Sequence, residues 1–320
     1  MKILVVGSGG REHALAWKLA NDSMQPELYC APGNAGTAEL GLNVNLAVTD
    51  LGGLCDWCHV ERPDLVVIGP EAPLCAGLTD RLEADGLRVF GPNRAAAELE
   101  GSKEFAKEVM AAAGVPTSAY ESFTDADAAC AYVRERGAPI VVKADGLAAG
   151  KGVRVAETVE QAEEAIRDAL EANAFGSAGG RVVIEDFLVG EEASILALID
   201  GEHIVLLASS QDHKRIFEKD EGPNTGGMGA YSPASIVNEV VREKVIREVY
   251  EPMLAELKKR GITYKGVLYA GLMIQDDQPA VVEFNCRFGD PETQAVLARW
   301  DGDMLPALEA VVDGTLSNDL

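Results

Sequence analysis

Three side chains that can bind metal and phosphate recur at alternate positions near the end of the chain: Glu283, Asn285 and Arg287. The residues between and before them are largely apolar, which predicts a β-strand, and alternate side chains of a strand share one face. A carboxylate, an amide oxygen and a guanidinium would then lie in one row, ~7 Å apart. These oxygen ligands suit Mg²⁺ held jointly with phosphates, and the arginine suits an anion. The alternative to a metal and phosphate site is a solvent-exposed strand face that carries an ordinary ion pair.

A glycine-rich segment, 145–152, offers a second set of groups for phosphates, with Lys143 at the end of the strand before it. It departs from the phosphate-binding loop G-x-x-x-x-G-K-[ST], because its glycine spacing is shorter and a strand follows instead of a helix. We therefore expect a hairpin flap that covers phosphates without a helix dipole. A flexible hairpin with an incidental lysine is the alternative. The flap residues expected to contact a nucleotide are Gly150, Lys151 and Gly152.

The segment 209–230 is the third polar region, and its glycines, Asn and Thr suit close contact with a ligand. A loop of this length inside a compact domain is usually functional or disordered. It carries Asp212 and the basic pair Lys214 and Arg215, which are notable in an acidic protein. We expect it to contribute to a binding site.

The first turn, Gly7–Gly10, invites a dinucleotide-binding interpretation that the sequence does not support. Glu12 stands where the third glycine of G-x-G-x-x-G belongs, and the strand that ends at Ala31 lacks the acid that would hold the ribose. An NAD-dependent oxidoreductase is therefore disfavoured. Gly9, Gly10 and Arg11 at a helix start still predict an anion site that suits the phosphate of a small substrate.

The pattern of elements predicts a multidomain fold with α/β and α+β parts. In residues 1–100, strands alternate with short helices and end in Gly/Pro loops, which indicates a Rossmann-like parallel sheet. Residues 117–190 indicate a small α+β unit. Beyond Ala193 we expect an antiparallel meander, including a hairpin with its loop at 275–279, and a long helix over 240–260 that Pro252 kinks or divides.

Composition narrows the classes of partner. The formal charge of −24 argues against a general affinity for nucleic acid or anionic membranes. No apolar run approaches the ~20 residues that span a bilayer. The first residues do not resemble a signal peptide, because a short apolar run leads straight into the glycine turn. We therefore expect a cytoplasmic protein of two or more domains.

Taken together, these segments resemble the ATP-grasp superfamily and, within it, the glycinamide ribonucleotide synthetase (phosphoribosylamine–glycine ligase) family. The superfamily resemblance is carried by residues 143–152, 185–194 and 283–287. The family resemblance is carried by residues 7–13, 69–74, 210–215, 222–229 and 287–294. The resemblance extends over essentially the whole chain.

The resemblance implies a domain organisation. Residues 1–100 would form a Rossmann-like N-terminal domain, 101–122 and 193–320 the central ATP-grasp subdomain, and 123–192 its lid. Family members continue through another domain after the last helix. We therefore expect a C-terminally shortened form that binds ATP, and the alternative to full activity is ATP binding with little or no turnover.

It also implies an activity. Members of the family use ATP with Mg²⁺ or Mn²⁺ to phosphorylate the carboxylate of glycine. The amine of 5-phosphoribosylamine then attacks the glycyl phosphate and gives glycinamide ribonucleotide, ADP and phosphate. The expected partners are therefore small molecules, with no nucleic acid and no membrane, and the expected state is a monomer.

Carried over by motif, the resemblance assigns roles to individual residues. ATP would be bound by the flap and by Lys103, Lys143, Glu185, Phe187, Leu188 and Glu192. The metal ligands would be Glu283 and Asn285, and Arg287 would stabilise the transferring phosphoryl group or the acyl phosphate. Gly9, Gly10 and Arg11 would hold the sugar phosphate. Asp212 and Lys214, grouped with Arg287 as catalytic and substrate-binding, would hold glycine.

Overall fold

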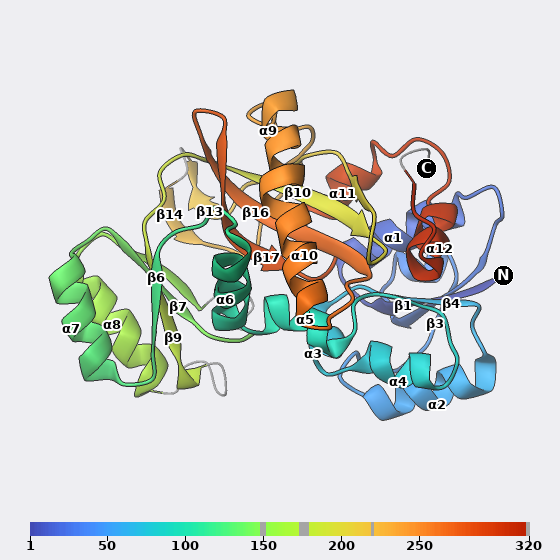
Figure 1. Ribbon diagram of the computed structural model, residues 1–320. Helices are drawn as coiled ribbons and strands as arrows, with labels where there is room; N and C mark the ends of the chain where they lie inside the picture. The colour runs from blue at the N-terminus through green and yellow to red at the C-terminus, as the bar shows by residue number, and fades with distance from the viewer. Residues whose placement is uncertain (148–151, 173–178, 219–220, 318–320) are drawn as a thin grey trace.

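The computed structural model describes residues 1–147, 152–172, 179–218 and 221–317. A parallel sheet lies at one end of the molecule, an antiparallel sheet in the middle and a second antiparallel sheet at the other end (Figure 1). This arrangement confirms the predicted fold class. Among the described helices, none is both long and apolar enough to cross a lipid bilayer.

The N-terminal part is a five-stranded parallel sheet in the order β3-β2-β1-β4-β5. Its central strand is apolar at successive positions, Ile3 to Val6, and each of these side chains is buried because helices cover both faces. The elements are β1 (Lys2–Gly7), α1 (Gly10–Ala20), β2 (Glu27–Pro32), η1 (Thr37–Glu39), β3 (Leu42–Asn43), α2 (Leu51–Glu61), β4 (Leu65–Ile68), α3 (Glu71–Cys75), α4 (Leu78–Ala84) and β5 (Val89–Phe90).

Two helices, α5 (Arg94–Gly101) and α6 (Lys103–Ala113), connect this part to the rest of the chain. The two helices are separated at Ser102. Ser102 has extended backbone angles, and its hydroxyl accepts a hydrogen bond from the amide of Phe105. Ser102 therefore ends α5 and caps the N-terminus of α6.

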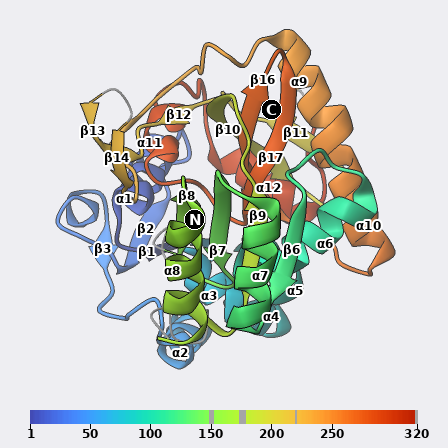
Figure 2. The same cartoon turned by 90° about the vertical axis from the view of Figure 1, so that its left-hand side faces the viewer.

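The unit at the opposite end is a four-stranded antiparallel sheet in the order β6-β9-β7-β8, with two helices packed on one face (Figure 2). Both helices begin at side-chain caps: Asp125 accepts from the amide of Ala128, and Thr158 accepts from the amide of Gln161. The unit has its own hydrophobic core. Its elements are β6 (Tyr120–Phe123), α7 (Ala126–Arg136), β7 (Ile140–Ala144), β8 (Val153–Ala156), α8 (Val159–Leu170) and β9 (Val182–Asp186).

The central sheet is antiparallel, in the order β11-β10-β16-β17. The hairpin between β16 and β17 turns on Asp276 and Asp277, with φ of 50° and 58°. It is tighter than the loop expected over 275–279, because two residues with positive φ close a hairpin without further residues. The strands are β10 (Glu191–Ile199), β11 (Ile204–Leu206), β16 (Gly266–Gln275) and β17 (Gln278–Asn285).

A long helix lies across this sheet (Figure 1). It is continuous in direction but composed of α9 (Glu239–Lys244), a π-helical turn η4 (Val245–Tyr250) and α10 (Glu251–Lys259). Pro252 cannot donate a backbone hydrogen bond, and the wider π turn directly before it accommodates this loss. The hydroxyl of Tyr250 donates to the carbonyls of Ile195 and Leu268, 2.9 and 3.1 Å away, which anchors the helix on β10 and β16.

Segment 209–230 contains short strands that sequence reasoning did not predict. β12 (Gln211–Asp212) pairs with β15 (Ala230–Tyr231), and β13 (Arg215–Phe217) pairs with β14 (Glu221–Asn224). Strands of two to four residues are too short to show an alternating pattern.

The N-terminal and central sheets share their hydrophobic cores, which fixes the parallel sheet against β17. One cluster joins Leu4 and Val6 to Ile195, and the other joins Ile3 and Val5 to the opposite face of the central sheet. The helices α11 (Glu292–Leu297) and α12 (Leu305–Asp313) pack in the second cluster. The loops of the parallel sheet therefore lie next to the end of β17.

Candidate active site

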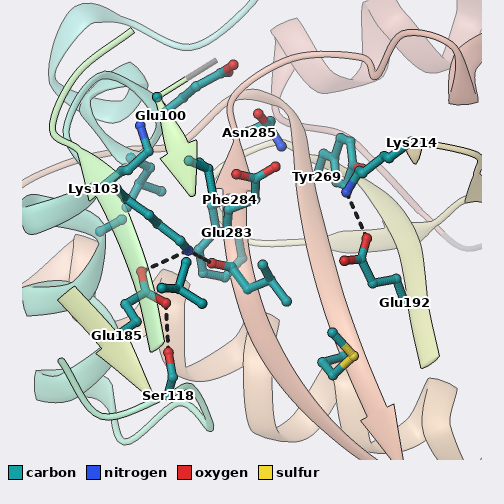
Figure 3. Close-up of a pocket in the computed structure, with 18 of the residues that line it drawn as sticks. Glu100, Lys103, Ser118, Glu185, Glu192, Lys214, Tyr269, Glu283, Phe284 and Asn285 are labelled. Atoms are coloured by element: carbon teal, nitrogen blue, oxygen red, sulfur yellow. Dashed lines mark hydrogen bonds and ion pairs between the residues drawn. The ribbon is translucent and has the colours of Figure 1, made fainter. Parts of the chain in front are cut away.

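A pocket of about 340 Å³ lies where the three parts meet. Strands β7 and β9 supply one wall, and β16 and β17 supply another. In Figure 3, Glu283 and Asn285 occupy the centre, with Lys103 and Glu185 on one side and Lys214 on the other. The pocket thus collects the polar segments that the sequence singled out, although they are far apart along the chain.

Strand β17 delivers the row of side chains that its sequence predicts. Glu283 and Asn285 line the pocket, and Arg287 lines it from just beyond the end of the strand. The alternation is not strict, because the pairing of β16 with β17 shifts register near Val282. Val282 and Phe284 also line the pocket, although Phe284 is part of the buried core.

Four cations surround the Glu283 carboxylate. Burial alone would raise the pKa of Glu283, but its basic neighbours hold that pKa below the ordinary value. The carboxylate is therefore ionised, and the positive charges outnumber it. Such a set is suited to a polyphosphate chain together with a cation. The basic neighbours are Lys214, Lys143, Lys103 and Arg287.

Lys143 is oriented by a buried carboxylate. Its ammonium lies 2.8 Å from Glu185 Oε1 and donates to the carbonyl of Val282 at 2.9 Å. Glu185 Oε2 lies 3.0 Å from the ammonium of Lys107 and accepts from the hydroxyl of Ser118 at 2.7 Å. Burial lowers the pKa of Lys107 to about 8, while the two lysines keep the pKa of Glu185 below its ordinary value against the effect of burial. Glu185 is therefore ionised at neutral pH.

Lys103 begins helix α6 and is tied to the start of the predicted flap. Asp145 Oδ1 accepts from the backbone amide of Lys103 at 2.6 Å, and the Lys103 ammonium donates to the carbonyl of Gly146 at 2.9 Å. Gly146 has a φ of +115°, which a residue with a side chain rarely adopts. Of the flap residues, Gly152 lines the pocket. Gly150 and Lys151 lie outside the described residues.

Asp212 and Lys214 place charges of both signs at the other end of the pocket. The Lys214 ammonium lies 2.9 Å from Glu192 Oε2 and 3.9 Å from Asp212 Oδ1. The side chain of Asp212 is only 6% exposed, and burial raises its pKa to about 6. Burial disfavours the charge of Lys214, but its acidic neighbours raise its pKa well above the ordinary value. This end suits a ligand that itself carries both charges.

The first glycine turn lies beside the pocket and outside its lining. The Arg11 side chain is buried, pairs with Glu12 and donates to the carbonyl of Phe288 at 3.1 Å. A methyl group on Gly10 would lie 2.9 Å from Gln294 Nε2, so the turn contacts the segment that follows Arg287. The assignment of Gly9, Gly10 and Arg11 to the sugar phosphate stays a prediction.

Several apolar side chains line the pocket: Phe187, Leu188, Met110, Val155 and Met273. The assignment of Phe187 and Leu188 to adenine stays a prediction. Flat apolar walls with a few polar groups are typical of sites for an aromatic base.

Sequence reasoning gave no role to several polar residues that line the pocket. Glu71 lies in a motif that carries the family resemblance, so that motif was the available signal. The sequence around Glu100 and Tyr269 contains no motif that indicates a functional role, because one residue lies in a helix and the other in a strand without unusual composition. The residues concerned are Glu71, Glu100, Lys107, Tyr269, Asp290 and Glu292.

The oxygen ligands on β17 suit a hard cation that takes its remaining ligands from phosphates and water. Within the described residues, no group of three or more His, Cys, Asp or Glu side chains could hold a metal by itself. Glu283 and Asn285 offer two oxygen ligands, and Mg²⁺ commonly takes one or two protein ligands with phosphates and water. Asn285 Oδ1 accepts from Arg287 Nη2 at 3.1 Å and retains a second lone pair.

Comparisons with known proteins agree along the whole chain. Residues 1–100 match the family described as phosphoribosylglycinamide synthetase, N domain, and residues 101–293 match phosphoribosylglycinamide synthetase, ATP-grasp (A) domain. The chain is 57% identical over 319 residues to the phosphoribosylamine–glycine ligase of Xanthomonas campestris pv. campestris, which covers 99% of this chain and 74% of that relative. It is 53% identical to the enzyme of the same name from Escherichia coli K12, with the same coverage of 99% and 74%.

Solved structures give the same result. The crystal structure of the phosphoribosylamine–glycine ligase of Thermotoga maritima superimposes with a TM-score of 0.86 at 33% identity, over 99% of this chain and 76% of that one. Biotin carboxylase from Campylobacter jejuni superimposes with a TM-score of 0.73 at 18% identity, over 99% of this chain and 72% of that one, and shows the fold alone. The chain belongs to the phosphoribosylglycinamide synthetase family, whose second part has the ATP-grasp fold.

Proposed function

We propose that the protein is a ligase that joins glycine to 5-phosphoribosylamine with ATP, giving glycinamide ribonucleotide, ADP and phosphate. Its relatives in the family are named phosphoribosylamine–glycine ligases, and the reaction forms a C–N bond. The observation that carries the proposal is the arrangement around Glu283, where Lys103, Lys143 and Arg287 lie near a second region, Asp212 and Lys214, that carries both charges. The first set suits ATP, and the second suits an amino acid.

ATP would lie with its base against Phe187 and Leu188 and with its phosphates toward Lys103 and Lys143. Glu185 orients Lys143 through the 2.8 Å contact, so this ammonium is in place before the nucleotide binds. Glu192, which lines the pocket and pairs with Lys214, would hold the ribose. The flap, of which Gly152 lines the pocket, would cover the phosphates and exclude water.

A divalent cation, Mg²⁺ or Mn²⁺, would be held by Glu283 and Asn285 and would neutralise charge on the phosphates. Asp212 would accept hydrogen bonds from the ammonium of glycine, and Lys214 would hold its carboxylate. Arg287 would stabilise the charge that develops on the transferring phosphoryl group and then on the acyl phosphate.

The two steps balance without a protein nucleophile. A glycine carboxylate oxygen bonds to the γ-phosphorus as ADP leaves. The amine of phosphoribosylamine then bonds to the glycyl carbonyl carbon, and phosphate leaves with the bridging oxygen while the amine loses a proton. Holding the sugar phosphate near Gly9, Gly10 and Arg11 would bring its amine toward the pocket from the N-terminal side.

Substrate omission tests this function. ADP release is measured with ATP, Mg²⁺, glycine and freshly prepared phosphoribosylamine, and then with each component left out. We expect release at the full rate only when all are present. ADP release that ignores glycine would refute the ligase assignment. ATP binding without turnover under every condition would support the alternative of a nucleotide-binding form.

Asp212 makes glycine binding depend on pH. Because burial raises the pKa of Asp212 to about 6, its carboxylate gains a proton and loses its charge as the pH falls through that value. Glycine remains a zwitterion over this range. We therefore expect the KM for glycine to rise by about tenfold per pH unit below 6.

The measurement is the KM for glycine between pH 5 and 8. The control is Asp212→Asn, which should have a high KM at every pH and no step. A KM that stays flat through pH 6 in the unmodified protein would remove Asp212 from the glycine site.

We also propose the domain limits that the resemblance implies: an N-terminal domain over 1–100, a central subdomain over 101–122 and 193–320, and a lid over 123–192. The monomeric state and the cytoplasmic location stay predictions from the sequence.

A further inference from the structure

The N-terminal part of the chain holds Arg287 in place through Glu100, in the last turn of α5. Glu100 Oε1 lies 2.8 Å from Arg287 Nη2, and Glu100 Oε2 accepts from the backbone amide of Cys286 at 2.8 Å. The Glu100 side chain is 8% exposed and that of Arg287 is 15% exposed. One carboxylate therefore fixes both the backbone and the guanidinium at the step from Cys286 to Arg287.

The same guanidinium makes contacts that point into the pocket. Its Nη2 also donates to Asn285 Oδ1 at 3.1 Å, so Glu100, Arg287 and a proposed metal ligand form one connected chain. On its other side, Arg287 Nε lies 3.5 Å from Glu71 Oε2. Within the described part of the protein, that Nε has no hydrogen-bond partner. Arg287 Nη1 donates to the carbonyl of Phe288 at 3.4 Å. The guanidinium is thus held from several sides, and its Nε makes no hydrogen bond among the described residues.

A purely structural ion pair would have other features. It would use its donors on the protein and lie away from the reacting groups. Here both Glu100 and Arg287 line the pocket, and the buried Arg287 Nε makes no hydrogen bond among the described residues, although Glu71 Oε2 lies 3.5 Å away. Arginine side chains are flexible, and a transition state gains most from charges that are already in place.

We propose that Glu100 is a positioning residue that presents Arg287 to the phosphoryl group during transfer. The inference rests on the proposed function of Arg287. Since Glu100 lies in the segment matched to the N domain and Arg287 in the segment matched to the A domain, the contact makes phosphoryl transfer depend on how the two parts join.

Glu100→Gln is the informative variant. A glutamine presents one oxygen and one NH₂ to two donors, the Cys286 amide and Arg287 Nη2, so one of the two contacts is lost. We expect kcat to fall by about a hundredfold, because a misplaced catalytic group of this kind costs about that much. The affinity for ADP, measured by calorimetry, and the KM for ATP should stay within about twofold, because the base and ribose contacts are untouched. Glu98→Gln, on the same helix and outside the pocket lining, is the control.

A double-mutant cycle separates positioning from general stability. We expect Glu100→Gln to lower kcat strongly in the unmodified protein and very little once Arg287→Ala is present. Equal losses in both backgrounds, or no loss in the first, would overturn the inference. Near-normal kcat for Arg287→Ala alone would instead overturn the proposed role of Arg287.

Two further experiments test the role of Glu100 if the kinetic comparison cannot be made. A crystal structure of Glu100→Gln should show the guanidinium displaced from Asn285, and an unmoved Arg287 would contradict the inference even if the residual rates are too low to compare. If the glutamine variant does not fold, Glu100→Asp replaces it. Aspartate keeps the charge but is too short to hold both donors, so it should show the same loss of kcat with unchanged ADP affinity.

Discussion

Replacing Glu283 by alanine is expected to reduce ATP turnover by at least about a hundredfold, the usual cost of losing a group that organises charge at a phosphoryl-transfer site. Glu283 is ionised because four cations oppose the effect of burial on its pKa. Without it, Asn285 is the remaining oxygen ligand on β17, and the cations face one another with no carboxylate between them. The loss should therefore affect cation-dependent turnover more than the binding of the adenine base.

The measurement is kcat as a function of Mg²⁺ concentration, with ADP affinity in the absence of Mg²⁺ as the companion. Glu283→Ala should need far more Mg²⁺ to reach its residual rate and should keep near-normal affinity for metal-free ADP. Glu251→Ala, an exposed position on the long helix, is the control. Near-normal turnover at ordinary Mg²⁺ would refute the metal role of Glu283.

Glu185→Gln is expected to have the largest effect on stability. The carboxylate of Glu185 lies between the ammonium groups of Lys107 and Lys143, at 3.0 and 2.8 Å, and all three side chains are buried. Removing one partner of a buried ion cluster leaves uncompensated charge, which costs about 3 kcal/mol. The cost should decrease as the pH rises toward 8 and level off above it, because losing Glu185 lowers the pKa of Lys107 further below its value of about 8, so the variant loses this charge at a lower pH than the parent does.

Hydrogen exchange of the β7 and β9 amides, which reports the free energy of local opening, is the appropriate measurement. Asp186→Asn is a matched control on the neighbouring residue. Asp186 pairs with Arg136 at the surface, and exposed pairs contribute at most about 1 kcal/mol. An equal effect of both variants, or a Glu185→Gln effect that grows with pH, would contradict the account of the cluster.

The row on β17 could be predicted because it depends on local periodicity. Glu283 and Asn285 face one pocket since a strand alternates its side chains, and this holds despite the register shift near Val282. The hydroxyl of Thr158 and the carboxylate of Asp125 cap their helices for equally local reasons. The parallel sheet could be predicted because its strands alternate with short helices and end in Gly/Pro loops.

Other side chains of the site could not be predicted, because their positions depend on contacts between distant segments. Lys107 appears in the sequence as one more polar residue of a helix, and its burial against Glu185 depends on how α6 meets β9. No local sequence pattern indicates the role of Glu100, because its partner, Arg287, lies 187 positions away. The resemblance assigned Glu185 to ATP, which stays a prediction, but it gave no hint that the Glu185 side chain contacts two lysines and a serine.

The central claim is that glycine is activated as an acyl phosphate, and oxygen-18 transfer tests it most directly. Glycine labelled in its carboxylate oxygens is supplied with ATP, Mg²⁺ and phosphoribosylamine, and the released phosphate is analysed by mass spectrometry. The account predicts that each phosphate carries one labelled oxygen and that the glycinamide product keeps the other. Phosphate without the label, formed at the same rate as ADP, would contradict it.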